Sequence, residues 1–124
     1  MDETIYLTLE DILSYYRETI EQSGGGMSGI REKESIEKIL DFVQNDLYYS
    51  TLEEKLTYLV YSFCTGHYFF DGNKRISLVI GAHFLIKNKH GWAGFHFLPL
   101  MEAYIWHVAA GNIGKELFGR IIHF

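Results

Sequence analysis

The sequence predicts an all-α fold, a compact bundle of about six helices that forms a single domain over residues 1–124. The first observation behind this prediction is that apolar residues recur at helical spacing along most of the chain. The second is that no internal repeat, low-complexity tract or linker divides it. The third is its composition, with 48% hydrophobic residues, 22% charged residues and one proline, which is ordinary for a globular domain able to bury a core.

The first half of the chain predicts three helices. The first runs from Leu9 to Ile20, with Thr8 as its N-cap, and the glycine-rich stretch SGGGMSG ends it. The second spans Ile36 to Val43. The third opens with a capping box, Thr51 to Glu54, and carries an apolar stripe as far as Phe63.

The second half predicts three more helices. Ile76 to Lys89 is apolar almost all round, which indicates a central buried helix, although a buried strand is the competing interpretation. Trp92 to Leu98 is rich in glycine and aromatic residues and predicts a loop. Pro99 then opens a fifth helix, because proline suits the first helical position. A short sixth helix spans Lys115 to Ile122.

Composition and charge exclude several classes of function. A net charge of −5 argues against nucleic acid as a direct partner, because binding phosphates needs a broad basic surface. A single cysteine, Cys64, allows no internal disulfide and fits a reducing cytosol. The N-terminus lacks the features of a signal peptide, and no apolar stretch reaches the ~20 residues of a membrane span. We therefore expect a soluble cytoplasmic protein with no membrane partner.

The densest cluster of reactive side chains is the stretch HYFFDGNKR, His67 to Arg75. It predicts a helix–loop–helix junction whose second helix begins near Asn73. Lys74 and Arg75 would then lie in the first helical turn, where cations meet the unfavourable positive end of the helix dipole. A bound anion removes this mismatch. Free backbone N–H groups, a glycine and two cations together predict a phosphate site.

Two further side chains of this stretch indicate transfer chemistry. His67, at the opposite end of the loop from Lys74 and Arg75, is suited to take a proton from an incoming hydroxyl. Asp71 is suited to hold a divalent cation that neutralises phosphates. The combination fits phosphoryl or nucleotidyl transfer. The competing interpretation is structural, with DGN as a turn, Asn73 as the N-cap and both cations solvated.

The same stretch resembles the signature of the Fic/Doc family, His-x-Phe-x-(Asp/Glu)-Gly-Asn-(Gly/Lys)-Arg. Upstream, SGGGMSGIREKESIEKIL is similar to the GG…GIRD…LLE.AL segment of Doc-like members. The chain length is close to that of the compact death-on-curing (Doc) branch, so the resemblance extends over the whole chain and implies the Fic/Doc fold. Every fixed position of the signature is matched, by His67, Phe69, Asp71, Gly72, Asn73, Lys74 and Arg75.

The resemblance implies a role for each matched residue. His67 would be the general base that deprotonates a hydroxyl on a target protein. Asp71 would bind Mg²⁺, and Phe69 would anchor the loop in the core. The phosphates of the nucleotide, ATP, would be held by Gly72, Asn73, Lys74 and Arg75.

Two departures from the AMP-transferring members decide the branch. Those members usually have glycine at the position of Lys74, and a second arginine where this chain has Leu78. Doc has the lysine, lacks that arginine and presents the γ-phosphate. The resemblance therefore implies a Doc-like toxin of a toxin–antitoxin module, a kinase acting on a target such as elongation factor Tu. The alternatives are AMP transfer to protein hydroxyls and a non-catalytic binding module that keeps the fold.

The resemblance also bears on target binding and inhibition. The family uses a flap that aligns a target segment by strand-like pairing, and the candidate here is NDLYYST, Asn45 to Thr51. The alternative is a loop between helices with exposed tyrosines. Many members carry an inhibitory helix with (Ser/Thr)-x-x-x-Glu-(Gly/Asn). The nearest stretch, Ser14 to Thr19, fails at its last position, which implies a separate antitoxin acting in trans.

The remaining reactive residues predict structural roles. Cys64 lies on an apolar stripe and predicts a small buried hydrophobe more than a nucleophile. The histidines outside the motif, His123 among them, show no spacing typical of a zinc site. Four aromatic residues are expected in the core, although one of them could border the adenine pocket: Trp92, Phe95, Phe97 and Trp106.

Overall fold

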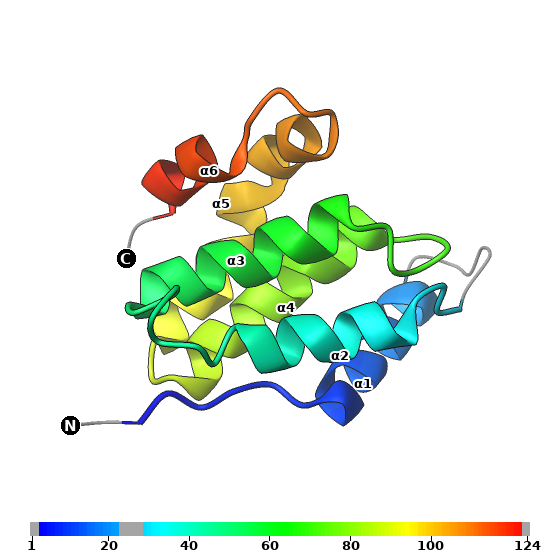
Figure 1. Cartoon of the computed structure of the whole chain (residues 1–124). Helices are drawn as coiled ribbons and strands as arrows, with labels where there is room; N and C mark the ends of the chain where they lie inside the picture. The colour runs from blue at the N-terminus through cyan, green and yellow to red at the C-terminus, as the bar shows by residue number, and fades with distance from the viewer. Residues whose placement is uncertain (1–2, 23–28, 123–124) are drawn as a thin grey trace.

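The computed structural model describes residues 3–22 and 29–122, and their regular secondary structure is helical, as the sequence predicts. An isolated antiparallel bridge, between Ile30 and Phe69, is the β-type pairing found within these ranges. The helices, drawn in Figure 1, are Leu9–Gln22 (α1), Lys33–Phe42 (α2), Leu52–Thr65 (α3), Asn73–Lys87 (α4), Gly91–Ala109 (α5) and Lys115–Ile121 (α6). None of them has both the length and the apolar composition needed to cross a membrane.

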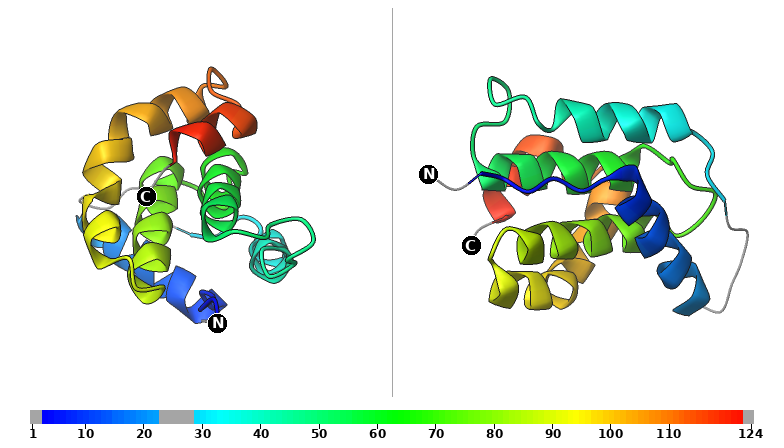
Figure 2. Two further views of the ribbon diagram at one scale, coloured as in Figure 1. Left: turned by 90° about the vertical axis from the view of Figure 1, so that its left-hand side faces the viewer. Right: turned by 90° about the horizontal axis from the view of Figure 1, so that it is seen from below.

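Helix α4 lies at the centre of the bundle. Helix α3 packs beside it, α5 and α6 lie on one side of this pair, and α1 and α2 lie on the other (Figures 1 and 2). Because neighbours surround α4, its residues are apolar nearly all round, and Ile76, Ile80 and Phe84 are fully buried. The prediction of a central buried helix is confirmed, and the competing prediction of a strand is wrong.

Side-chain caps fix the starts of two helices where the sequence predicts them. The Thr8 hydroxyl accepts a hydrogen bond from the Asp11 N–H (3.2 Å), and the Asp11 carboxylate accepts one from the Thr8 N–H (2.9 Å). The same reciprocal pair joins Thr51 and Glu54 at the start of α3, with both bonds at 3.1 Å. Each pair satisfies two backbone donors that the helix leaves unbonded. The glycine run expected to end the first helix, Gly24 to Gly26, lies outside the described residues.

The fifth helix differs from the prediction. Trp92–Leu98 is helix rather than loop, and Pro99 lies inside α5 instead of opening it. The reason lies in how α5 is placed in the tertiary structure. A side chain at Gly94 would meet the Ala82 carbonyl oxygen at 2.8 Å, so glycine here allows α5 to approach α4 closely. Pro99 removes one helical hydrogen bond, but it lies on the exposed face, where water can bind the carbonyl left without a partner.

Candidate active site

The motif stretch forms the loop between α3 and α4, and its backbone bends sharply at its start. Gly66 caps α3, and the Tyr68 ring packs so closely on it that any side chain at residue 66 would collide with that ring. His67 follows with a positive φ of 54°, which is uncommon for a residue other than glycine. This turn directs the chain out of α3 and leaves His67 exposed at the surface.

Backbone hydrogen bonds hold the motif loop to the segment before α2. The Arg31 N–H donates to the Tyr68 carbonyl oxygen (2.7 Å), and the Phe70 N–H donates to the Gly29 carbonyl oxygen (3.1 Å). These bonds accompany the antiparallel bridge between Ile30 and Phe69. Segments almost 40 residues apart in the sequence therefore fix one another at the site, which helix periodicity could not predict.

Phe69 is the side chain that ties the loop to the core. It is fully buried, and its ring stacks on Tyr16 of α1 with the centroids 4.1 Å apart. The Tyr16 hydroxyl in turn accepts a hydrogen bond from the Gly29 N–H (3.2 Å). Tyr16 thus supports both segments that meet at the site. Helical periodicity is consistent with Tyr16 on the apolar face of the first helix, but it carries no signal for this second role.

Gly72 and Asn73 shape the turn into α4. Gly72 is the N-cap residue and adopts a left-handed conformation, with φ 77°. The Asn73 side chain turns back, donating to the Phe69 carbonyl oxygen (2.9 Å) and accepting from the Phe69 N–H (3.2 Å). The structural alternative of Asn73 as the N-cap is therefore wrong, because its amide closes the loop instead of capping the helix.

The start of α4 offers backbone donors and cations to the same volume. Its first hydrogen bond runs from the Ile76 N–H to the Gly72 carbonyl oxygen (2.9 Å), so the preceding N–H groups have no acceptor inside the helix. A cavity of about 320 Å³ opens there. Lys74 and Arg75 lie beside it, at the positive end of the helix dipole. The helix end and the two cations would favour an anion in this cavity, whereas the Asp71 and Glu102 carboxylates that also line it would repel one unless a bound cation neutralises them.

Helix α5 supplies the opposite wall of this cavity. Glu102, Ile105 and Trp106 face the motif residues across it. The Lys74 ammonium lies over the Trp106 ring, with its nitrogen 4.4 Å from the ring centroid. The expectation that Trp106 belongs to the core is wrong, since 62% of its surface is exposed. Trp106 was one of four aromatic residues of which one could border the adenine pocket, whereas Glu102 was not singled out, because only the packing of α5 on α4 brings it there.

The predicted site residues all belong to the motif loop and the start of α4, but they do not all line the cavity. Five of them do, whereas His67 lies outside the cavity, on the side of the loop that follows α3. Phe69 lies beneath the loop in the core. The five that line the cavity are Asp71, Gly72, Asn73, Lys74 and Arg75.

Asp71 is the motif carboxylate on which a metal would depend. It is exposed, and one of its oxygens accepts a hydrogen bond from the Gly72 N–H (2.8 Å). Among the described residues no three histidine, cysteine or acidic side chains cluster closely enough to enclose a metal ion. Mg²⁺ does not need such a cluster, because it commonly binds through one or two carboxylates together with substrate phosphates. A carboxylate at the edge of an anion cavity therefore fits Mg²⁺.

The predicted flap lies in the wrong place. Asn45 to Thr51 joins α2 to the start of α3, whereas His67 follows the end of α3 (Figure 1). The helix between them has 14 residues, about 20 Å at 1.5 Å per residue. The loop also folds on itself, since the Tyr48 and Tyr49 N–H groups both donate to the Asn45 carbonyl oxygen (3.2 and 3.0 Å). The segment that pairs with the motif is 29–32.

The stretch nearest to an inhibitory motif belongs to the core. Ser14 to Thr19 lies inside α1, where Tyr15, Tyr16 and Thr19 are buried. The Tyr15 ring stacks on His83 of α4, with centroids 4.0 Å apart. These contacts use the segment as part of the scaffold.

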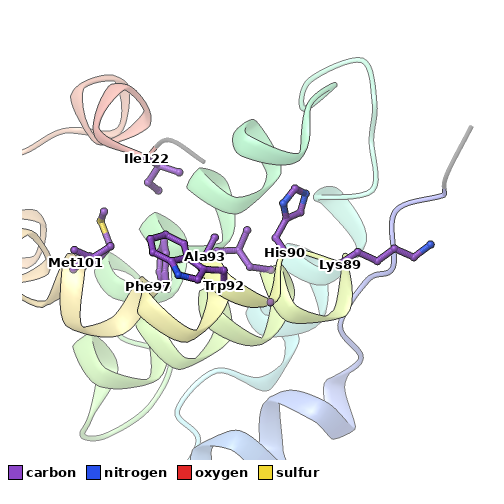
Figure 3. A pocket seen from close by; sticks show the side chains of 10 residues that line it. Lys89, His90, Trp92, Ala93, Phe97, Met101 and Ile122 are labelled. Atoms are coloured by element: carbon purple, nitrogen blue, oxygen red, sulfur yellow. The ribbon is translucent and has the colours of Figure 1, made fainter.

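The remaining candidates lie away from the motif cavity or inside the protein. Burial raises the pKa of the Cys64 thiol to about 11, so this group is a buried hydrophobe, as predicted. At the far end of α5, an apolar cavity of about 410 Å³ lies between α4, α5 and Ile122 (Figure 3). Phe97 faces it and is buried as expected, whereas Trp92 and Phe95 are 74% and 79% exposed, against expectation. His123 lies outside the described residues.

Comparison with protein families identifies a match for this chain. The profile of the Fic/DOC family matches residues 6–85, a range that begins before α1, includes the motif loop and ends in α4. No curated protein matches the chain. The match does not reach α5 and α6, so the prediction that residues 1–124 form a single domain stays a prediction.

Proposed function

The chain belongs to the Fic/DOC family, whose members generally transfer nucleotide-derived groups to proteins, and on this premise we propose that it moves the γ-phosphate of ATP to a hydroxyl side chain of a target protein. The observation that carries the proposal is the start of α4, where unbonded N–H groups and two cations border a cavity. That arrangement suits the phosphates of a nucleotide.

Each motif residue has a distinct task in this proposal. The His67 imidazole accepts the proton of the target hydroxyl, the hydroxyl oxygen bonds to the γ-phosphorus, and ADP leaves with the electrons of the broken P–O bond. The N–H groups at the start of α4, with Lys74 and Arg75, hold the phosphates. Asp71 would hold Mg²⁺, which supplies charge neutralisation when bound. Phe69 and the Asn73 side chain keep the loop in position.

The choice of the γ-phosphate rests on Lys74 and on the residue one helical turn beyond Arg75. That residue is Leu78, which borders the cavity and is 1% exposed, so the helix presents no second arginine to the nucleotide. AMP transfer to a protein hydroxyl is the alternative within the same site. It would place the α-phosphate, instead of the γ-phosphate, next to the target.

We further propose that the protein acts in the cytoplasm as a Doc-like toxin that is inhibited by a separate antitoxin. A translation factor such as elongation factor Tu would be its target. Ser14 to Thr19 supports a restraint in trans, because these residues are engaged in the core and lack the last inhibitory position. If the protein is a toxin, expression of the wild type should arrest growth, while expression of His67→Ala should not. Equal arrest by both proteins would contradict a catalytic toxin.

Incubation with ATP labelled separately at the α- and γ-phosphates tests the transferred group. With a cell extract as the source of targets, we expect label on protein from γ-labelled ATP only. Label from the α-phosphate would replace kinase activity with AMP transfer. Absence of label from both, with nucleotide binding intact, would favour a non-catalytic binding module.

Two substitutions test the roles within the site. His67→Ala should lower the transfer rate by about 10²–10⁴-fold while nucleotide binding changes little, because the imidazole does not hold the phosphates. His107→Ala, at an exposed position in α5, is the matched control and should keep full activity. Asp71→Asn should remove the Mg²⁺ dependence of nucleotide affinity, measured by calorimetry with and without the metal. An unchanged Mg²⁺ dependence in that variant would exclude Asp71 as the metal ligand.

A further inference from the structure

Helix α5 presents an apolar stripe to solvent along most of its length. At 100° per residue, the positions that point away from α4 repeat every three or four residues. The three large rings among them are 74%, 79% and 62% exposed. All members of the stripe are exposed, and they are Trp92, Phe95, His96, Pro99, Ala103 and Trp106.

This stripe is unusual because it contains no aspartate, glutamate, lysine or arginine. The opposite face of α5 is also apolar, since Phe97, Ile105 and Val108 are buried against the bundle. A helix that is apolar on both faces is normally covered on both. The apolar cavity of Figure 3 adjoins the stripe at Trp92 and enlarges the apolar surface.

We propose that a second copy of this chain covers the stripe, with the two α5 helices packed antiparallel about a two-fold axis near Pro99. The stripe is self-complementary in this register. Trp92 of one copy would lie beside Trp106 of the other, and Phe95 would lie over the small side chain of Ala103. Each residue pair has its midpoint at residue 99, as an isologous interface requires.

Charge favours a second copy over an acidic or basic partner. The chain carries a net charge of −5, so two copies repel one another over most of their surfaces. The six stripe positions themselves carry no acidic or basic side chain of the Asp, Glu, Lys or Arg type, and the charged neighbours of the stripe are Glu102 and Lys74, which lie beside Trp106. A strongly charged partner would find no complementary charge on it.

The exposed area of the stripe is also large enough to form the centre of a stable dimer interface. A fully exposed Phe or Trp ring offers roughly 150–250 Å². At their exposed fractions, Trp92, Phe95 and Trp106 together contribute roughly 400–500 Å². A stable interface buries about 800 Å² per partner, rim included. The three rings therefore supply about half of this area, and the rest of the stripe and its polar borders can supply the remainder.

Sedimentation equilibrium with substituted proteins tests the proposal. The wild type should have twice the mass of one chain at about 50 µM. Phe95→Glu should shift it to a monomer at the same concentration, because a carboxylate would be buried in an apolar interface. Leu47→Glu is the matched control, because Leu47 is 94% exposed in the loop between α2 and α3, and it should remain a dimer. Circular dichroism checks that each variant is folded.

A cysteine cross-link tests the register without relying on a destabilised interface. Under oxidised glutathione, Pro99→Cys should form a disulfide-linked dimer, since two copies of residue 99 face each other at the axis. Ala110→Cys should not, because antiparallel α5 helices would hold its two copies about 33 Å apart. The native thiol, Cys64, is buried and does not interfere.

A monomeric wild type at about 50 µM would overturn the proposal. So would a Phe95→Glu variant that remains a dimer, or cross-linking that is as efficient at residue 110 as at residue 99. An α5 stripe covered instead by a different protein would give the first of these results.

Discussion

Replacing Phe69 by alanine should destabilise the protein strongly, whereas the same change at the neighbouring Phe70 should not. Phe69 is fully buried and stacks on Tyr16, while 52% of Phe70 is exposed. The antiparallel bridge explains the difference, because consecutive side chains of an extended segment point to opposite faces. The two phenylalanines therefore form a matched pair within the same motif.

The expected magnitudes follow from these surroundings. Removal of a buried phenylalanine ring costs about 3–5 kcal/mol, which includes the cavity it leaves. Phe70 loses a contact with Arg31, whose guanidinium carbon is 5.9 Å from the ring centroid, and an exposed contact of this kind contributes about 0.5–1 kcal/mol. A domain of this length has a total stability of about 6–18 kcal/mol, so Phe69→Ala should remain folded, and it should be marginally stable if the wild type lies near the lower end of that range.

Urea unfolding followed by circular dichroism measures both variants. Phe69→Ala should lower the free energy of unfolding by about 3–5 kcal/mol and the Tm by about 10–20 °C. Phe70→Ala should lower the free energy of unfolding by at most about 1 kcal/mol and the Tm by a few degrees. The slope of the free energy of unfolding against urea concentration should be the same in the variants as in the wild type. An equal slope would indicate that the variants are as compact as the wild type. Equal losses for the two variants, or a larger loss for Phe70→Ala, would refute the assignment of Phe69 as the core anchor.

Three further outcomes are expected. Gly72→Ala should cost about 1–2 kcal/mol in urea unfolding, because φ is 77° at that position; a cost near zero would contradict the left-handed turn. Gly94→Ala should lower the Tm, since the new Cβ would meet the Ala82 carbonyl oxygen at 2.8 Å. Gly91→Ala is the control, and it should leave the Tm unchanged or raise it, because no atom lies within 4 Å of the added Cβ. Burial lowers the pKa of His83, so the folded state disfavours its proton, and the free energy of unfolding should fall as the pH drops below about 6.5. His83→Phe, which keeps the stack on Tyr15, should show a smaller fall between pH 7.5 and 5.5, and an identical pH dependence would contradict this reasoning.

Much of the fold was predictable because the signals for it are local. The capping pairs at Thr8 and Thr51 and the apolar periodicity of the first four helices involve residues within a turn or two of each other. The motif junction was predictable for the same reason, since a helix that ends at Thr65 and another that begins at Asn73 leave one short loop between them. The sequence by itself thus determined the helices and the gathering of reactive groups in one loop.

The tertiary structure alone decided features that depend on distant residues. Gly94 and Pro99 predict a helix break when only neighbours in sequence are considered, yet both are accommodated in α5, one by close packing on α4 and the other by exposure. The pairing of residues 29–32 with the motif, and the wall that Glu102 and Trp106 add to the cavity, join segments with no local relation. Local periodicity specifies which residues are helical. Which face of a helix meets a neighbour, and which is left to solvent, depends on how the helices pack together.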